Sequence, residues 1–359
     1  MNVLAAFRVA LLVIGSSVVL MTVATAASKI VRTWRERRAS QLAAQVRPAV
    51  LAAIDDGGRA PELVRRRRAV AESIAISLLP KLRGEDREAL ATMLLDTGII
   101  GTAARGLDSR SGARRQRCAQ LLGDAGHRPA RPRLVELLHD RDHDVRLTAA
   151  RALGRIGDPA SVPDLFAALG DRRVPANTAS MAVLRIGDAG GDAIALATHD
   201  ERTLVRSTAA ELAGPLGLLS ANARLIEMLD DPDGSVRAAA ARSLGRLSMP
   251  SSVPPVRARL GSLLDADVGD ERIEEIVALV TALGQIGHRD AIDVLEASLT
   301  RHRRISNAAA EALAPMSPRR SITSKAQRVR EIGSSDPGDE SSHERDAPPW
   351  PAPVARAVS

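Results

Sequence analysis

Hydrophobic and polar residues alternate with a helical period in the segment from Asp140 to Asp171. Apolar residues three or four positions apart predict a short helix over 145–155, and Gly157-Asp158-Pro159 ends it. A second apolar stripe predicts another short helix over 160–169. Neither helix is long enough to be stable alone in water, so the apolar face of each needs a neighbour.

Copies of this two-helix unit supply the neighbours. A Leu followed by Gly, Ala or Arg recurs at steps of 31, 31, 28, 32, 39 and 30 residues. A period near 31 with two helices per unit is the signature of a helical solenoid, an all-α α–α superhelix. The recurring leucines are Leu122, Leu153, Leu184, Leu212, Leu244, Leu283 and Leu313.

From Gly101 to Ala314 the units resemble the short HEAT repeats of phycobilisome-lyase-type proteins, which read roughly D-x5-R-x2-A-A-x-A-L-G-x-I-G-D. The resemblance implies an armadillo-like solenoid in which an Asp and an Arg six positions later form a hydrogen-bond ladder between adjacent repeats. One unit departs from this pattern, with Asp171 followed by Asn177. The resemblance assigns the ladder to Asp140 with Arg146, Asp200 with Arg206, and Asp231 with Arg237.

Residues 9–27 contain no charge and would span about 28 Å as a helix, close to the thickness of a bilayer core of about 30 Å. This predicts a single transmembrane helix. The basic flank from Lys29 to Arg38 places the N-terminus outside and the solenoid in the cytoplasm. The rival interpretation is a signal peptide cleaved near Ala24-Thr25-Ala26, which would make the solenoid an exported protein.

The expected organisation has five parts. The repeats carry an insertion over Gly261 to Arg272, expected to be an acidic surface loop. The last part is rich in Pro, Ser and mixed charge, which predicts disorder. The parts are a short extension (1–8), the transmembrane helix (9–27), basic juxtamembrane helices with degenerate capping repeats (28–100), the solenoid (101–314) and the tail (315–359).

Charge distribution argues against a nucleic-acid partner, although the net charge is +7. Residues 101–314 hold 28 basic and 28 acidic residues, a balance of zero, whereas a solenoid that binds nucleic acid should carry a basic stripe. Phe166 is the one aromatic residue in this range, which leaves no stacking platform for bases. The predominance of Arg over Lys, with only three lysines among 50 basic residues, suggests a high-GC bacterial source.

Candidate chemistry is sparse. The segment His139 to Asp144 could hold a divalent metal, but Asp residues at a repeat turn more often cap the next helix. Cys118 lies where a small apolar residue is expected and is interpreted as a packed core thiol. With no paired-His zinc motif, phosphate loop or nucleophile elbow, we expect no metal, no cofactor, no small-molecule site and no enzymatic activity.

The sequence therefore predicts a non-catalytic, single-pass membrane scaffold that binds a protein partner through its solenoid. Resemblance to anchored bacterial HEAT proteins suggests a partner in cell-envelope biogenesis, such as a membrane glycosyltransferase. The alternatives are a lyase-type enzyme related to bilin lyases and an exported solenoid protein.

Overall fold

The computed structural model describes residues 3–59, 63–265, 269 and 272–316, and these residues contain α-helices and short 3-10 turns but no strand. Side chains before residue 20 and the tail from residue 317 lie outside the described part, so the predicted tail is not addressed. The helices are α1 (Val3–Asp55), α2 (Arg65–Leu78), α3 (Gly84–Asp96), α4 (Ile99–Gly106), α5 (Gly112–Ala125), α6 (Arg131–Glu136), α7 (His143–Ile156), α8 (Val162–Gly170), α9 (Ala176–Ile186), α10 (Gly191–Ala197), α11 (Thr203–Ala213), α12 (Asn222–Glu227), α13 (Gly234–Leu247), α14 (Val253–Asp265), α15 (Ile273–Ile286), α16 (Ile292–Ser298) and α17 (Arg303–Leu313).

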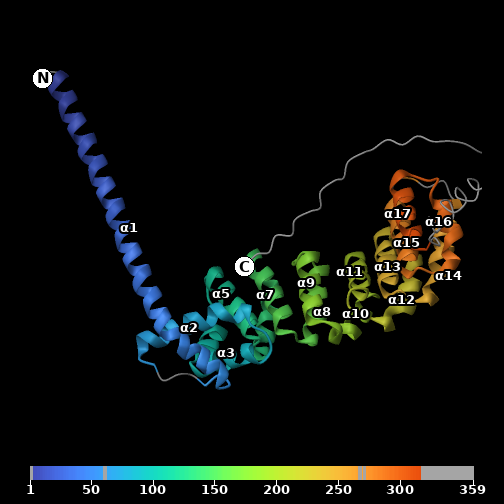
Figure 1. The fold of residues 1–359 in the computed structure, drawn as a ribbon, viewed down its shortest axis with the longest axis horizontal. Coiled ribbons are helices and arrows are strands. Elements are labelled where there is room, and N and C mark those ends of the chain that lie inside the picture. The colour runs from blue at the N-terminus through green and yellow to red at the C-terminus, as the bar shows by residue number, and fades with distance from the viewer. Residues whose placement is uncertain (1–2, 60–62, 266–268, 270–271, 317–359) are drawn as a thin grey trace, which may run out of the picture. The chain divides into compact units, whose positions relative to one another are not determined.

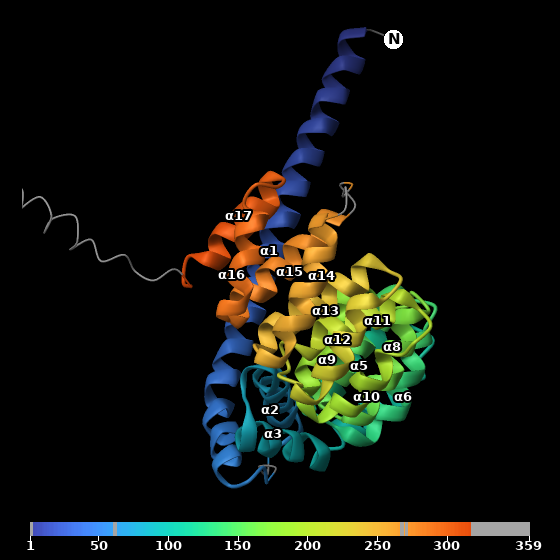
Figure 2. The ribbon, with the colours of Figure 1, turned by 90° about the vertical axis from the view of Figure 1, so that its right-hand side faces the viewer.

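Within the repeats the helices form two packed rows (Figure 1). Consecutive odd-numbered helices from α5 to α17 pack on one another. Each even-numbered helix from α6 to α16 packs against the odd-numbered helix that follows it. Viewed from the end in Figure 2, successive repeats lie behind one another. Each helix thus buries its apolar stripe against the next copy, as expected for a solenoid.

Local signals place the helix ends. The Asp142 side chain accepts a hydrogen bond from the Asp144 N–H at 3.0 Å and caps the start of α7. Gly157, with φ of 72°, ends the same helix in the left-handed conformation that glycine adopts without strain. The helix predicted over 145–155 is therefore α7, and the one predicted over 160–169 corresponds to α8.

Small residues set the spacing within the odd-numbered row. A Cβ placed on Gly123 would lie 2.6 Å from the Ala152 Cα, and one on Gly154 would lie 2.6 Å from the Ala182 Cα. Such distances are far shorter than carbon–carbon contacts, so the glycine allows the two backbones to touch. The same close approach recurs at Gly214 against Ser243, Gly245 against Ala282 and Gly284 against Ala312.

The predicted membrane span is contradicted. Among the described residues, no helix is long and apolar enough to cross a bilayer. Residues 9–27 belong to α1, which continues without a break through the basic residues after Lys29 to Asp55. The transmembrane helix and the single-pass location at the cell membrane are therefore corrected, whereas the side chains of residues 9–19 lie outside the described part.

Two further expectations about helix bounds change. The first of the expected juxtamembrane helices, over residues 40–54, is not separate but forms the last part of α1, which continues through Pro48 and packs on α2 and α3. The insertion expected as a loop over Gly261 to Arg272 begins as helix, because α14 continues to Asp265 with Leu263 and Leu264 buried. The apolar period of α14 extends into the segment, and its acidic residues masked that signal in the sequence.

Candidate functional site

The odd-numbered helices present one row of solvent-facing side chains. The residues of this row occupy equivalent positions, each immediately before the small or leucine residue that faces the neighbouring helix. All of them are exposed or half-exposed. We call this row the odd-helix face; it consists of Gln120, Arg151, Met181, Glu211, Arg242, Thr281 and Glu311.

The odd-helix face varies from repeat to repeat, while the buried side of the same helices does not. Two positions before each face residue, five of the seven helices carry a buried alanine. The face itself holds an amide, two arginines, a methionine, two glutamates and a threonine. Packing thus explains the repetition inside, but it does not explain the variation outside. Variation on a common scaffold is what a surface that recognises a specific partner requires.

Charged side chains connect neighbouring helices along this face. Glu211 of α11 accepts from Arg242 at 2.7 Å and from Arg246 at 3.1 Å, both on α13. Asp124 of α5 pairs with Arg155 of α7 at 3.0 Å. Burial raises the pKa of Asp124, although Arg155 and other arginines act in the opposite direction. Glu211 on the face and Asp124 of α5 are therefore both matched by arginines.

The ladder residues assigned from the sequence are placed at the turns between repeats. In each assigned pair the Arg Nη1 donates to the backbone carbonyl of its own Asp, at 2.9 Å for Arg146, 3.0 Å for Arg206 and 2.8 Å for Arg237. Arg206 also reaches the carboxylate of Asp231 in the next repeat with two bonds, of 2.9 and 3.1 Å. That these contacts hold adjacent repeats together stays a prediction.

Two partners in these contacts were missed in the sequence. Asp140 is held by Arg115 through two bonds of 2.7 Å, and Arg237 is held by Glu275 at 2.6 Å. Arg115 lies 31 residues before Arg146, so the period itself could have identified it. Glu275 follows the long insertion, where a register count fails.

The contacts of the ladder differ at the third unit. Asp171 pairs with Arg202 at 3.1 Å, and Arg146 donates to the Arg173 carbonyl at 3.0 Å rather than to a carboxylate. Asp200 is held by Arg202 of its own turn at 2.9 Å. With Asn177 where the pattern has an arginine, no side chain of α9 reaches the Asp200 carboxylate among the described contacts.

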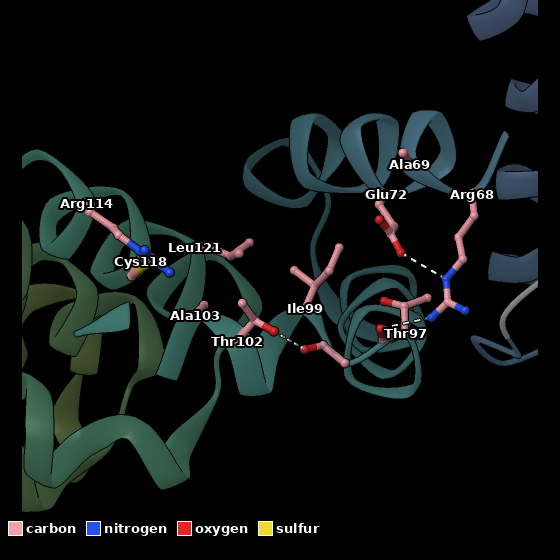
Figure 3. A pocket seen from close by; sticks show the side chains of 11 residues that line it. Arg68, Ala69, Glu72, Thr97, Ile99, Thr102, Ala103, Arg114, Cys118 and Leu121 are labelled. Atoms are coloured by element: carbon pink, nitrogen blue, oxygen red, sulfur yellow. Dashed lines mark hydrogen bonds and ion pairs between the residues drawn. The ribbon is translucent and has the colours of Figure 1, made fainter. Parts of the chain in front are cut away.

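A pocket of about 700 Å³ lies between α2, α4 and α5 (Figure 3). Its polar groups already have partners, since Arg68 donates to Glu72 at 3.1 Å and to the Thr97 carbonyl at 2.9 Å. Burial raises the pKa of the Cys118 thiol, and the arginines Arg114 and Arg117 lower it by less. A protonated, half-buried thiol is a poor nucleophile, so Cys118 is not activated for nucleophilic attack in this pocket.

The His139 to Asp144 segment is occupied by structural contacts. Asp140 binds Arg115, Asp142 caps α7, and His143 Nδ1 lies 3.1 Å from Arg146. Among the residues that the structure describes, no group of three or more His, Cys, Asp or Glu side chains is arranged to hold a metal ion.

Comparison with known proteins identifies the repeats. The family of HEAT repeats matches residues 103–184 and 192–276, and the PBS lyase HEAT-like repeat matches residues 277–301. The alpha subunit of phycocyanobilin lyase from Picosynechococcus sp. is 38% identical over 96 residues, which are 26% of this chain and 36% of that protein. The chain thus spans about a third of the length of this relative.

The chain resembles several solved structures, all with low TM-scores. Human deoxyhypusine hydroxylase has a TM-score of 0.30 at 20% identity, covering 77% of this chain and 97% of that one. The CpcE–CpcF complex of phycocyanin lyase from Nostoc sp. has a TM-score of 0.27 at 21% identity, covering 77% and 96%. A designed armadillo repeat protein has a TM-score of 0.30 at 16% identity, covering 61% and 100%.

The repeat matches and the helical architecture agree. The chain is an all-α solenoid of HEAT repeats, including one of the PBS lyase type, and is homologous over part of its length to a phycocyanobilin lyase subunit.

Proposed function

We propose that the protein is a non-catalytic scaffold that binds a protein partner through the odd-helix face. The observation that carries the proposal is the contrast between the repeated alanines inside and the varied side chains on the face. Stacked repeats form extended surfaces suited to binding other proteins. Met181 and Arg151 are of the types enriched at protein interfaces, and Met181 is 54% exposed.

The side chains on and beside the face indicate which kind of partner surface would bind there. Arg151 of the face lies near Arg155 and Arg185, which are on the same two helices, α7 and α9, and the carboxylate of Asp124 is already paired with Arg155. A partner with an apolar side chain surrounded by carboxylates would complement Met181 and its arginine neighbours.

The test compares two exposed apolar residues on different rows. A photo-crosslinking amino acid at position 181 identifies the partner in extracts of the source cells, and the purified partner is then titrated against variants. Met181→Asp should weaken binding by about tenfold or more, as expected for a central contact. Leu196→Asp is the matched control, because Leu196 is 73% exposed but lies on α10 in the other row. Equal affinity of the two variants would contradict the proposal.

A second candidate function follows from the similarity to the phycocyanobilin lyase subunit. It predicts that the purified chain binds a bilin or transfers it to a carrier protein. The poverty in aromatic residues counts against it, since Phe166 is the one aromatic residue of the solenoid. An unchanged bilin absorption spectrum on mixing with the protein would exclude this function.

A further inference from the structure

A second cavity, of about 540 Å³, lies where the turn before α3 meets the C-terminal ends of α5, α7 and α9. It is lined by four guanidinium groups and one carboxylate, with an apolar wall formed by the turn over residues 79–82. The charged residues are Arg83, Arg87, Asp124, Arg155 and Arg185.

Several N–H donors in the cavity have no acceptor. Arg87 donates through Nε and Nη2 to backbone carbonyls, including that of Asp124 at 2.8 Å, which leaves its Nη1 available. Arg155 pairs with Asp124, but its buried Nε has no hydrogen-bond partner. Within the described part of the chain, no ion pair or hydrogen bond is assigned to the side chains of Arg83 and Arg185.

The charges lining the cavity do not cancel. Four arginines face one carboxylate and three helix C-termini, each worth about half a negative charge, so an excess of about +1.5 remains. The arginines repel one another, and Arg155 shows the effect. Burial lowers the pKa of its guanidinium, Asp124 acts to raise that pKa, and Arg185, Arg151 and Arg87 lower it further. An anion in the cavity would relieve this repulsion.

We infer that the cavity binds the phosphate group of a small phosphorylated molecule. A phosphate monoester carries about −1.5 to −2 at pH 7, close to the uncompensated charge. Guanidinium forks bind its oxygens through paired, charge-assisted bonds. The volume lies within the roughly 300–1,000 Å³ of small-molecule sites, and Pro80 and Leu82 offer an apolar surface to the organic part.

This inference goes beyond the proposed scaffold function, and its test uses no protein partner, so the two can fail separately. The full chain is titrated by calorimetry with glucose 6-phosphate, inorganic phosphate and glucose. We expect glucose 6-phosphate to bind most tightly, phosphate to bind more weakly and glucose not to bind. Arg185→Gln should weaken the binding of glucose 6-phosphate by about tenfold or more, the usual loss of a hydrogen bond to a charged group.

Two controls keep the result interpretable. Arg185 is exposed and unpaired in the described part, so its replacement should leave the thermal unfolding temperature unchanged. Arg303→Gln replaces another exposed arginine, at the start of α17, and should leave the affinity unchanged. The inference is overturned if no ligand binds at millimolar concentration or if both variants bind equally well. It is also overturned if inorganic phosphate binds as tightly as the ester, or if a phosphoserine peptide binds more tightly than glucose 6-phosphate.

Discussion

Gly154 offers a test in which packing and helix propensity predict opposite signs. It lies inside α7, where alanine is normally more favourable than glycine by about 1 kcal/mol. A Cβ at this position would lie 2.6 Å from the Cα of Ala182 and 3.0 Å from its Cβ and its carbonyl oxygen. None of these atoms can rotate away, because they belong to the backbone or are fixed to it. Gly154→Ala must therefore push α7 and α9 apart.

The size of the effect follows from the two opposing contributions. Overpacking a well-filled interface costs about 1–3 kcal/mol, and the gain in propensity offsets about 1 kcal/mol of it. The net destabilisation should reach up to about 2 kcal/mol. Gly261→Ala is the matched control, since Gly261 lies in α14 with no atom within 4 Å of a Cβ. It should stabilise its helix by about 1 kcal/mol, so the two variants should differ by about 1–3 kcal/mol.

Hydrogen exchange measured by mass spectrometry suits this comparison, because repeat arrays do not always unfold in a single step. Amides of α7 and α9 should exchange faster in Gly154→Ala than in the unmodified protein, by up to about 30-fold for 2 kcal/mol. Amides of α14 should exchange more slowly in Gly261→Ala. If Gly154→Ala slowed exchange in α7 and α9, the close approach would not limit the spacing of the helices and the reasoning would be refuted.

Three other predictions concern charge and the thiol. Arg206→Gln should lower the free energy of unfolding by about 1–3 kcal/mol, because it leaves the buried Asp231 carboxylate without its ion-pair partner. Arg246→Gln, at an exposed ion pair, should lower it by about 1 kcal/mol or less. Urea titration measures both values. Burial acts to raise the pKa of Glu275, but bonds and charges from its two arginines outweigh burial and lower it. Its stabilisation should therefore be present above about pH 4.3 and disappear as the pH falls through the depressed pKa, and Glu275→Gln should flatten the acid limb of a stability profile. Burial raises the pKa of Cys118, so its thiol should react with a disulfide reagent at pH 8 several-fold more slowly than free cysteine.

The repeat architecture could be predicted from the sequence because its signals are local and redundant. Asp142 and Asp233 cap the starts of α7 and α13. Gly126, Gly157 and Gly287 end α5, α7 and α15 in the left-handed conformation, and the apolar stripe recurs with the period. Even the partner of Asp140 was accessible in principle, since Arg115 precedes Arg146 by one period. The failures occurred where periodicity gave no support, at the insertion before Glu275 and at the N-terminal uncharged run, which was assigned from its composition alone.

The arginine cavity could not be predicted, because it depends on residues that no sequence period connects. Arg83 and Arg87 come from the N-terminal helices, whereas Arg155 and Arg185 come from consecutive repeats. In the sequence all four look like ordinary surface arginines among 50 basic residues. Only the packing of α3 beside the C-terminal ends of α5 and α7 shows that their charges converge and that few of their donors have acceptors.

Two departures from the repeat pattern coincide at the junction of α9 and α11. Leu184 replaces the glycine found at the equivalent position of α7 and α11, so the two backbones lack the close approach made elsewhere in the row. Asn177 stands where the pattern has an arginine, and no side chain of α9 reaches the Asp200 carboxylate among the described contacts. This junction therefore lacks the close glycine contact found at the other junctions of the row. Because α9 also carries Met181 and Arg185, residues proposed to bind a partner and a phosphate lie on a helix that borders this junction. A ligand that contacts both α7 and α9 would bind across the junction that Gly154 holds close, and not across the junction of α9 and α11, where that close approach is absent.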